Sequence, residues 1–357
     1  MKKIHFIYGA FWVITLTLVA LFFQTPVSQQ PNEMADSGVL LKGQVIERHD
    51  NVVYVKLISG PRQTVKTELN DLFFHDDYKK GDKVSLYVTE MEDGRLRYDI
   101  QDYYHKDGLL AVFVLFGVLA VLIAGKKGIF SILSVMLSLF LFYAIILNAV
   151  KAGFPLLPAG LIYIFLITVL TIPLIHGFNR KSLSSLIAVN AGYAAGFLFT
   201  YFFAAAAHIG NTPSEEFRTL LSQFPDTDIR QVLILSLFLG AAGALIDVAV
   251  TICSAVFEGL KENPGLSFTK TYRLGMEVGK DILGSMINTL LLAYLAASLP
   301  FLTLMAMARF NDVHEFLNYD FVALELTRIF LGAFSIILLI PIASVAAAYF
   351  VAKNAKR

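Results

Sequence analysis

One carboxylate lies in the middle of a membrane-length apolar run. Asp247 belongs to the segment LGAAGALIDVAVTICSAVFEGL, residues 239–260, in which Glu258 is the other charged residue. An ionisable side chain at bilayer depth costs on the order of a few kcal/mol unless it faces a protein interior, a water-filled cavity or a partner. We therefore predict a functional site at Asp247. An interhelical hydrogen bond and a position nearer the membrane interface are the structural alternatives.

Asp247 shares one side of its predicted helix with small and polar residues. They recur at spacings of three and four, which place side chains on one face of an α-helix. They are Gly240, Gly243, Ala244, Asp247, Thr251, Ser254 and Glu258. Because small residues let helix backbones approach closely in lipid, we assign Gly240, Gly243 and Ala244 to helix packing. We predict that Asp247, Thr251 and Ser254 line a polar site within the membrane.

A second polar face follows in the next apolar run, GMEVGKDILGSMINTLLLAYL. Its members are Glu277, Lys280, Asp281, Gly284, Ser285, Asn288 and Leu292. The polar end comes first in this run and last in the preceding one, so both faces converge on the same half of the membrane. We predict that Asp281, Ser285 and Asn288 line the same site, and we assign Gly284 to helix packing. Asp281 has two alternative explanations, a place in the first helical turn or an ion pair with Lys280 or Arg273.

Two further segments bear on this site. Asn190, in SLIAVNAGYAAGF, is a third candidate contributor from another apolar run. The connection between the two polar faces is basic and contains the turn Asn263-Pro264-Gly265. After this turn, apolar and charged residues alternate through residues 268–280, which predicts a short amphipathic segment on the inner membrane surface.

The composition indicates that the bilayer is the solvent for most of the chain. Hydrophobic residues make up 56% of it and charged residues 16%, far from the proportions of a soluble domain. About 20 apolar residues span the hydrocarbon core of a bilayer. Runs of that kind predict a membrane all-α fold, a polytopic bundle of about eight transmembrane helices. They cover residues 5–23, 108–124, 129–149, 159–177, 183–207, 231–257, 281–307 and 329–352.

Basic residues predict how these helices are oriented, because short loops rich in Lys and Arg stay in the cytoplasm. With both termini cytoplasmic in the cell membrane, one side collects most of the basic residues of termini and short loops. They are Lys2, Lys3, Lys126, Lys127, Arg180, Lys181, Lys261, Lys270, Arg273, Lys280, Lys353, Lys356 and Arg357. The first run is predicted to be a retained anchor, domain 1–24, since FFQTPVSQQ after it lacks a small-x-small cleavage site.

Residues 38–104 differ in composition from the flanking apolar runs. Five short β-type runs, separated by turns such as Ser59-Gly60-Pro61 and Lys80-Gly81-Asp82, fall within this segment. They predict a small extracytoplasmic β domain, β-barrel-like and similar to an OB barrel. Residues 108–357 then form the multi-helix transmembrane domain.

The two polar runs resemble the YibE/F-like family of bacterial multi-pass membrane proteins. The likeness lies in GAAGALIDVAVTICSAVFE and RLGMEVGKDILGSMINTLLLAYL. Residues that correspond to the family pattern are Gly243, Asp247, Gly275, Gly279, Asp281, Gly284, Met286, Asn288 and Thr289. Ser285 departs from it, since Thr is commoner there, and we class Gly279 with the helix-packing residues. The resemblance implies a polytopic membrane protein that is often encoded beside a second member, without implying a reaction.

Three classes of function remain open from these residues. A permease-like transporter would bind an ion or small polar solute near Asp247, Asp281 and Asn288. A non-transporting scaffold or assembly subunit would use the polar faces to pair with a homologous membrane protein or a second copy. An intramembrane aspartyl-type hydrolase built on Asp247 and Asp281 is disfavoured, because the VGKD context of Asp281 is not Gly-x-Gly-Asp.

Other chemistries find no support in the sequence. There is no G-x-S-x-G motif, no P-loop and no C-x-x-C pair, and the seven His residues are scattered. We therefore predict no enzymatic activity, no cofactor and no metal site. A net charge of +1 gives no reason to expect nucleic acid as a partner. The bilayer is the partner that the composition requires.

Overall fold

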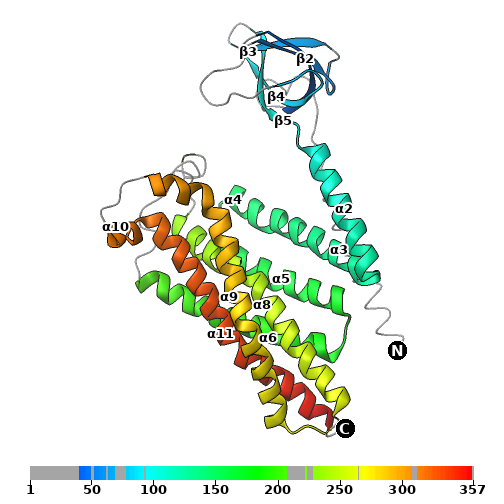
Figure 1. Ribbon diagram of the computed structural model, residues 1–357, viewed down its shortest axis with the longest axis vertical. Coiled ribbons are helices and arrows are strands. Elements are labelled where there is room, and N and C mark those ends of the chain that lie inside the picture. Colours follow the sequence, from blue (N-terminus) through cyan, green and yellow to red (C-terminus); the bar gives the residue numbers. More distant parts are fainter. Residues whose placement is uncertain are drawn as a thin grey trace. The chain divides into compact units, whose positions relative to one another are not determined.

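The computed structural model describes residues 40–49, 52–61, 63–68, 78–91, 94–206, 222, 228–263, 265–307 and 312–355. Within them, the chain divides into two compact units. One contains the β strands and the helix that follows them, and the other contains the remaining helices from residue 130 onward (Figure 1). The predicted anchor at residues 5–23 lies outside the described residues.

The first unit is a five-stranded antiparallel sheet. Its strands are β1 Leu40–His49, β2 Val52–Leu57, β3 Thr64–Glu68, β4 Lys83–Glu90 and β5 Leu96–Tyr103, in the order β3-β2-β1-β4-β5. Side chains alternate between the two faces of a strand, so apolar residues at every second position form one core. Leu41 and Val45 of β1 lie in that core with Val53 and Val55 of β2. The outer strands β3 and β5 also meet, because Thr67 Oγ1 donates a hydrogen bond to the Tyr98 carbonyl at 2.6 Å.

Helix α2, Lys106–Ala124, follows directly after β5 and is tied to the sheet by charge. The Asp107 carboxylate accepts hydrogen bonds from Lys42 Nζ at 3.1 Å and from Lys83 Nζ at 2.6 Å. Lys42 Nζ also lies 3.9 Å from the centre of the Tyr104 ring. Strands β1 and β4 therefore both contact the first turn of α2.

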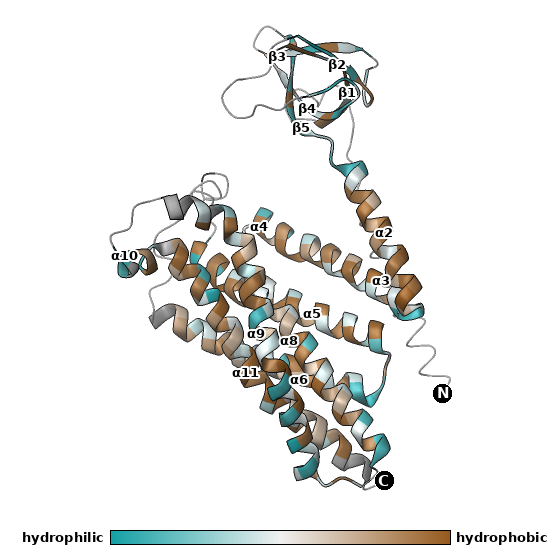
Figure 2. Ribbon diagram, viewed as in Figure 1, coloured by the Kyte–Doolittle hydropathy of each residue, from teal (hydrophilic) through white to brown (hydrophobic). Residues whose placement is uncertain are grey.

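The second unit is a bundle of long helices. The first is α3 Lys126–Leu141, which continues through the π-helical turn Phe142–Leu147 into the short α4 Asn148–Lys151. The others are α5 Leu156–His176, α6 Arg180–Ala206, α8 Ile229–Glu262, α9 Phe268–Met307 and α11 Asp320–Ala355, with the short α10 Val313–Leu317 before α11. Together with α2, seven helical runs in the described residues are long and apolar enough to cross a membrane. They correspond to the seven predicted runs from 108–124 to 329–352, and Figure 2 shows how apolar residues dominate them.

Helix α8 packs against α5, α6, α9 and α11. One side of it is fully buried through Leu245, Val248 and Ile252, which join the large apolar core of the bundle. Helices α9 and α11 approach closely, because a Cβ on Gly275 would lie 2.7 Å from Ser344 Oγ. The small residues of these runs thus serve the backbone contacts that lipid-embedded helices need.

The predicted amphipathic surface segment at residues 268–280 was wrong as a separate element. The structure has one continuous helix α9 from Phe268, so these residues form its first turns. The alternation of apolar and charged residues reflects a helix with one packed side, where Met276 and Val278 contact the apolar core. Asp281 is accordingly well inside the helix and not in its first turn.

Candidate functional site

The polar residues of α8 lie on the side of the helix opposite its buried core. Asp247 and Thr251 are exposed in this chain and Ser254 is partly buried, whereas Leu245, Val248 and Ile252 are buried. The helical period predicts this division, since residues three and four apart share a face. The polar row therefore faces away from the bundle that this chain forms.

The Asp247 carboxylate has no hydrogen bond or ion pair to any residue that the structure describes. Asp247 lies eleven positions before Glu258, the next charged residue, and Glu258 pairs with Lys261 at 2.9 Å. At 1.5 Å per residue, that separation is about 16 Å, or half of a hydrocarbon core about 30 Å thick. Asp247 thus lies near mid-membrane depth if Glu258 marks the polar boundary.

Helix α9 carries a second exposed polar row. Asp281, Ser285 and Asn288 are all exposed, and the membrane-crossing stretch of α9 is 11% buried compared with 56% for α8. The Ser285 hydroxyl donates to the Ile282 carbonyl at 2.8 Å, and Thr289 donates to the Ser285 carbonyl at 2.8 Å. For Asp281 and Asn288, the described part of the chain supplies no hydrogen-bond partner. We call the α8 and α9 rows together the polar face, comprising Asp247, Thr251, Ser254, Asp281, Ser285 and Asn288.

Two close contacts fix the relative height of α8 and α9. A Cβ on Gly240 would overlap Tyr294 Oη, and a Cβ on Gly259 would lie 2.9 Å from Leu274 Cδ2. The helices are therefore antiparallel neighbours, and residues at equal distances from these contacts lie at the same height. Counted from either contact, Asp247 lies at the height of Met286 or Ile287, within two residues of Asn288.

The other members of the two rows match in the same way. Thr251 lies within two residues of the height of Gly284, and Ser254 within two residues of that of Asp281. Since each residue adds 1.5 Å along a helix, the offset is no more than about 3 Å throughout. The structure thus brings the rows to matched depths on adjacent helices, although no hydrogen bond joins them among the described residues.

Asn190, the third predicted contributor, lies elsewhere. Its amide donates to the Leu186 carbonyl at 2.9 Å and to Thr168 Oγ1 at 3.4 Å. It therefore serves the contact between α6 and α5. The structure does not bring it to the polar face.

The residues assigned to helix packing fall into two groups. Gly240 contacts α9 at Tyr294, Gly279 contacts α11 at Ile340, and Ala244 packs against the apolar core. A Cβ on Gly243 or Gly284 would meet nothing within 4 Å among the described residues. These two glycines belong to the exposed side of α8 and α9, so a packing role for them requires a neighbour from outside the described bundle.

Comparison with known proteins identifies the family. The model of the YibE/F-like protein family matches residues 112–353, which is well over half of the chain. The chain belongs to the YibE/F-like family. The matched segment contains the whole polar face and leaves out the β strands. No curated protein and no solved structure matches the chain.

This family member also has a polar cluster that the sequence reasoning missed. Glu325 of α11 is 7% exposed, and its Oε1 accepts a hydrogen bond from Arg328 Nη1 at 2.7 Å. The Arg328 guanidinium lies 5.7 Å from the centre of the Tyr294 ring on α9. Glu325 Oε2, Arg328 Nε and Tyr294 Oη are buried without a hydrogen-bond partner among the described residues. A carboxylate and an arginine three residues apart, at the start of an apolar run, were the signal that could have revealed it.

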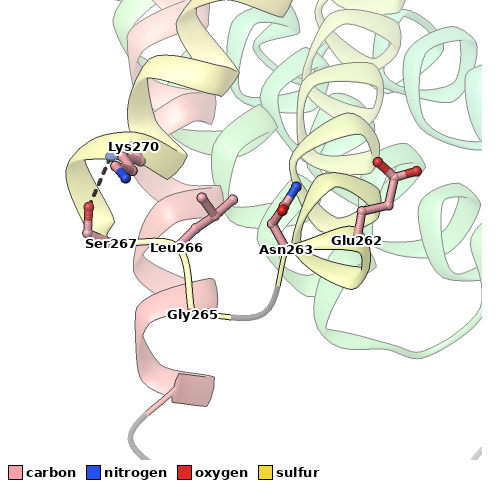
Figure 3. A pocket seen from close by; sticks show the side chains of 6 residues that line it. All are labelled: Glu262, Asn263, Gly265, Leu266, Ser267 and Lys270. Atoms are coloured by element: carbon pink, nitrogen blue, oxygen red, sulfur yellow. Dashed lines mark hydrogen bonds between the residues drawn. The ribbon is translucent and has the colours of Figure 1, made fainter.

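A shallow pocket lies at the turn between α8 and α9, apart from the polar face. Figure 3 shows its lining, which is Glu262, Asn263, Gly265, Leu266, Ser267 and Lys270. Ser267 Oγ accepts a hydrogen bond from the Lys270 backbone N–H at 3.4 Å and so caps the start of α9. The pocket includes no residue of the polar face, and we regard it as a feature of the turn.

Proposed function

We propose that this protein is a permease-like transporter that moves an ion or a small polar solute across the cell membrane along the polar face of α8 and α9. The observation that carries the proposal is the Asp247 carboxylate, exposed near mid-membrane depth and unpaired among the described residues. Lipid contact would cost on the order of a few kcal/mol, so water, a solute or a partner must reach it. Asn288 and Asp281 add exposed polar groups on the neighbouring helix α9, with Asn288 at a height close to that of Asp247.

The proposal includes an orientation and a place for the β domain. The basic residues at the termini and at the α8–α9 turn support a cytoplasmic location for both ends of the chain. On that orientation the β domain is extracytoplasmic. Its strand order and the contact between β3 and β5 support a small barrel that is closed between these two strands, as in an OB-like fold. The role that we propose is not enzymatic.

Solute movement can be tested without knowing the solute. Purified protein in vesicles is challenged with osmotic gradients of monovalent and divalent salts, amino acids and polyols, and light scattering follows shrinkage and reswelling. We expect at least one solute to re-enter faster than in protein-free vesicles, with Asp247→Asn abolishing the difference. Asp247→Glu should retain part of it, because the charge remains.

Glu258→Gln is the matched control, since Glu258 is an exposed carboxylate of the same row that pairs with Lys261. It should transport like the wild type. Equal solute entry through wild type and Asp247→Asn, or entry no faster than in empty vesicles for every solute, would contradict the proposed function.

A second candidate function is a non-transporting assembly subunit of a membrane complex. Gly243 and Gly284 favour it, because both glycines face open space on the outer side of the bundle, as they would where another helix packs closely. An interface needs the hydrogen bonding of Asp247 and not its charge. An assembly subunit should therefore tolerate Asp247→Asn and fail with Asp247→Leu, as judged by recovery of the intact complex from the membrane.

A further inference from the structure

We propose that the polar face is a two-fold interface between two copies of this chain, in which the α8 row of one copy packs against the α9 row of the other. Asp247 of each copy then meets the partner's Asn288. The inference deepens the proposed permease, on which it rests for the use of the face as a solute path, by naming the partner that covers that face.

The chain's own membrane-length runs outside the bundle core offer no amide or Lys/Arg donor for Asp247. Residues 109–124 of α2 contain no polar side chain. Residues 5–23 contain the hydroxyl and ring donors of His5, Tyr8, Trp12, Thr15 and Thr17, but no Asn, Gln, Lys or Arg. A carboxylate at bilayer depth requires hydrogen-bond donors, and an amide offers two N–H groups from one side chain. Another copy of the polar face supplies them.

A two-fold axis along the membrane normal preserves depth, so each residue faces partner residues at its own height. Because the two rows have matched heights, each residue of the α8 row then faces a residue of the partner's α9 row. The Asn288 amide carries two N–H donors for the Asp247 carboxylate, and the Ser254 hydroxyl can donate to Asp281. Each pair occurs twice because the interface is isologous.

The alternative two-fold arrangement, α8 against α8, is disfavoured. It would bring the two Asp247 carboxylates together at the axis, and like charges at close range oppose ionisation of both. Packing α8 against the partner's α9 separates them and gives each one an amide. The avoidance of a like-charge contact thus selects one arrangement of the face.

The exposed glycines fit the same arrangement. Thr251 lies at the height of Gly284, where the absence of a side chain leaves room for a partner helix. Gly243 offers the same close approach on α8. Neither glycine has an intramolecular neighbour among the described residues that would explain it.

Disulfide trapping between two tagged copies tests the interface. The chain has one cysteine, the buried Cys253, so a Cys253→Ala background is free of thiols. One copy carries Thr251→Cys and the other Gly284→Cys, and both are co-expressed and oxidised in membranes. We expect a doubly tagged, disulfide-linked dimer. Ile187→Cys in both copies is the control, because Ile187 is 47% exposed on α6 at the height of Val250 and should not crosslink.

Mass measurement in lipid nanodiscs provides the second readout. Wild-type protein should be dimeric, and Gly284→Leu should be at least tenfold more dissociated. The chain's own fold should survive this change, because position 284 is exposed and a Cβ there would meet nothing within 4 Å among the described residues. Ala191→Leu, a similar enlargement at an exposed position of α6, should remain dimeric.

The outcomes separate this inference from the proposed function. Monomeric wild-type protein, equal crosslinking at Ile187, or a 1:1 adduct with a different protein would overturn the two-copy interface, whatever the vesicles show. A dimer with the expected crosslink and no solute movement would uphold the interface and remove the permease. A monomer that still moves solute would overturn the interface and uphold the permease.

Discussion

At the scale of single residues, this protein holds two carboxylates within apolar helices in opposite ways. Glu325 is buried against Arg328 and close to Tyr294, whereas Asp247 is exposed and has no partner among the described residues. A buried ion pair retains its charges through mutual contact, and removing one partner leaves the other charge uncompensated. Glu325 therefore serves the contact of α11 with α9, and Asp247 remains available to water, solute or another chain.

The Glu325–Arg328 pair leads to a stability prediction. Glu325→Ala should lower the free energy of unfolding by about 3 kcal/mol, because it leaves the partly buried Arg328 guanidinium without its charged partner. Unfolding in detergent can be followed with a thiol-reactive dye, since Cys253 is buried and is the one thiol in the chain. The double variant Glu325→Leu with Arg328→Met should recover much of the loss. Wild-type stability in Glu325→Ala would show that the pair is not buried as described.

At the scale of helices, the glycines of α9 are of two kinds: some pack against a neighbouring helix of the chain, and one lies on the exposed side. On α9, Gly275 and Gly279 are pressed against α11, while Gly284 points away from it. All three lie in one helical run, and their spacing alone does not say which side of the helix each one serves. Gly275 and Gly279 therefore serve packing within the bundle, whereas Gly284 lies on the exposed side of α9.

Substitution at Gly279 tests the internal contact. A Cβ there would overlap the side chain of Ile340, which is branched and held in the core, so Gly279→Ala should destabilise the chain by about 1–3 kcal/mol. Thiol-dye unfolding measures this as well. Ile340→Ala provides the matched control: in the double variant the loss should be smaller than the two single losses added together. Additive effects would mean that the residues do not touch.

Much of the helical architecture could be predicted from the sequence, because membrane-length apolar runs leave few alternatives. The helical period likewise predicted the row of Asp247, Thr251 and Ser254. Periodicity does not tell which side of a helix meets a neighbour, so the outward direction of that row could not be predicted. The same limit applies to Asn190, whose depth is similar to that of Asp247 but whose side chain faces α5.

At the scale of the whole molecule, the chain joins a soluble-type sheet to a lipid-embedded bundle, and the connection passes through the start of α2. Asp107 at the start of α2 forms ion pairs with Lys42 of β1 and Lys83 of β4. These hydrogen bonds also draw the Asp107 carboxylate toward the end of the sheet where Tyr104 stacks with Lys42. We therefore expect Asp107, which lies outside the matched family segment, to hold the direction of α2 relative to the β domain.

Asp107→Asn should therefore loosen the β domain on its helix without unfolding either. An amide lacks the charge that holds two ammonium groups, so the sheet and α2 should sample a wider range of relative orientations. Spin labels at Leu96→Cys in β5 and Leu119→Cys in α2, in a Cys253→Ala background, report the distance between them; Leu96 is 48% exposed and Leu119 47%, so both accept a label. Pulsed electron paramagnetic resonance should show a single narrow distance with Asp107 and a broader distribution with Asn. Asp99→Asn is the matched control, because Asp99 pairs with Arg97 within β5 and does not touch α2. If both variants broaden the distribution equally, or neither does, the Lys42–Asp107–Lys83 contact does not set the direction of α2.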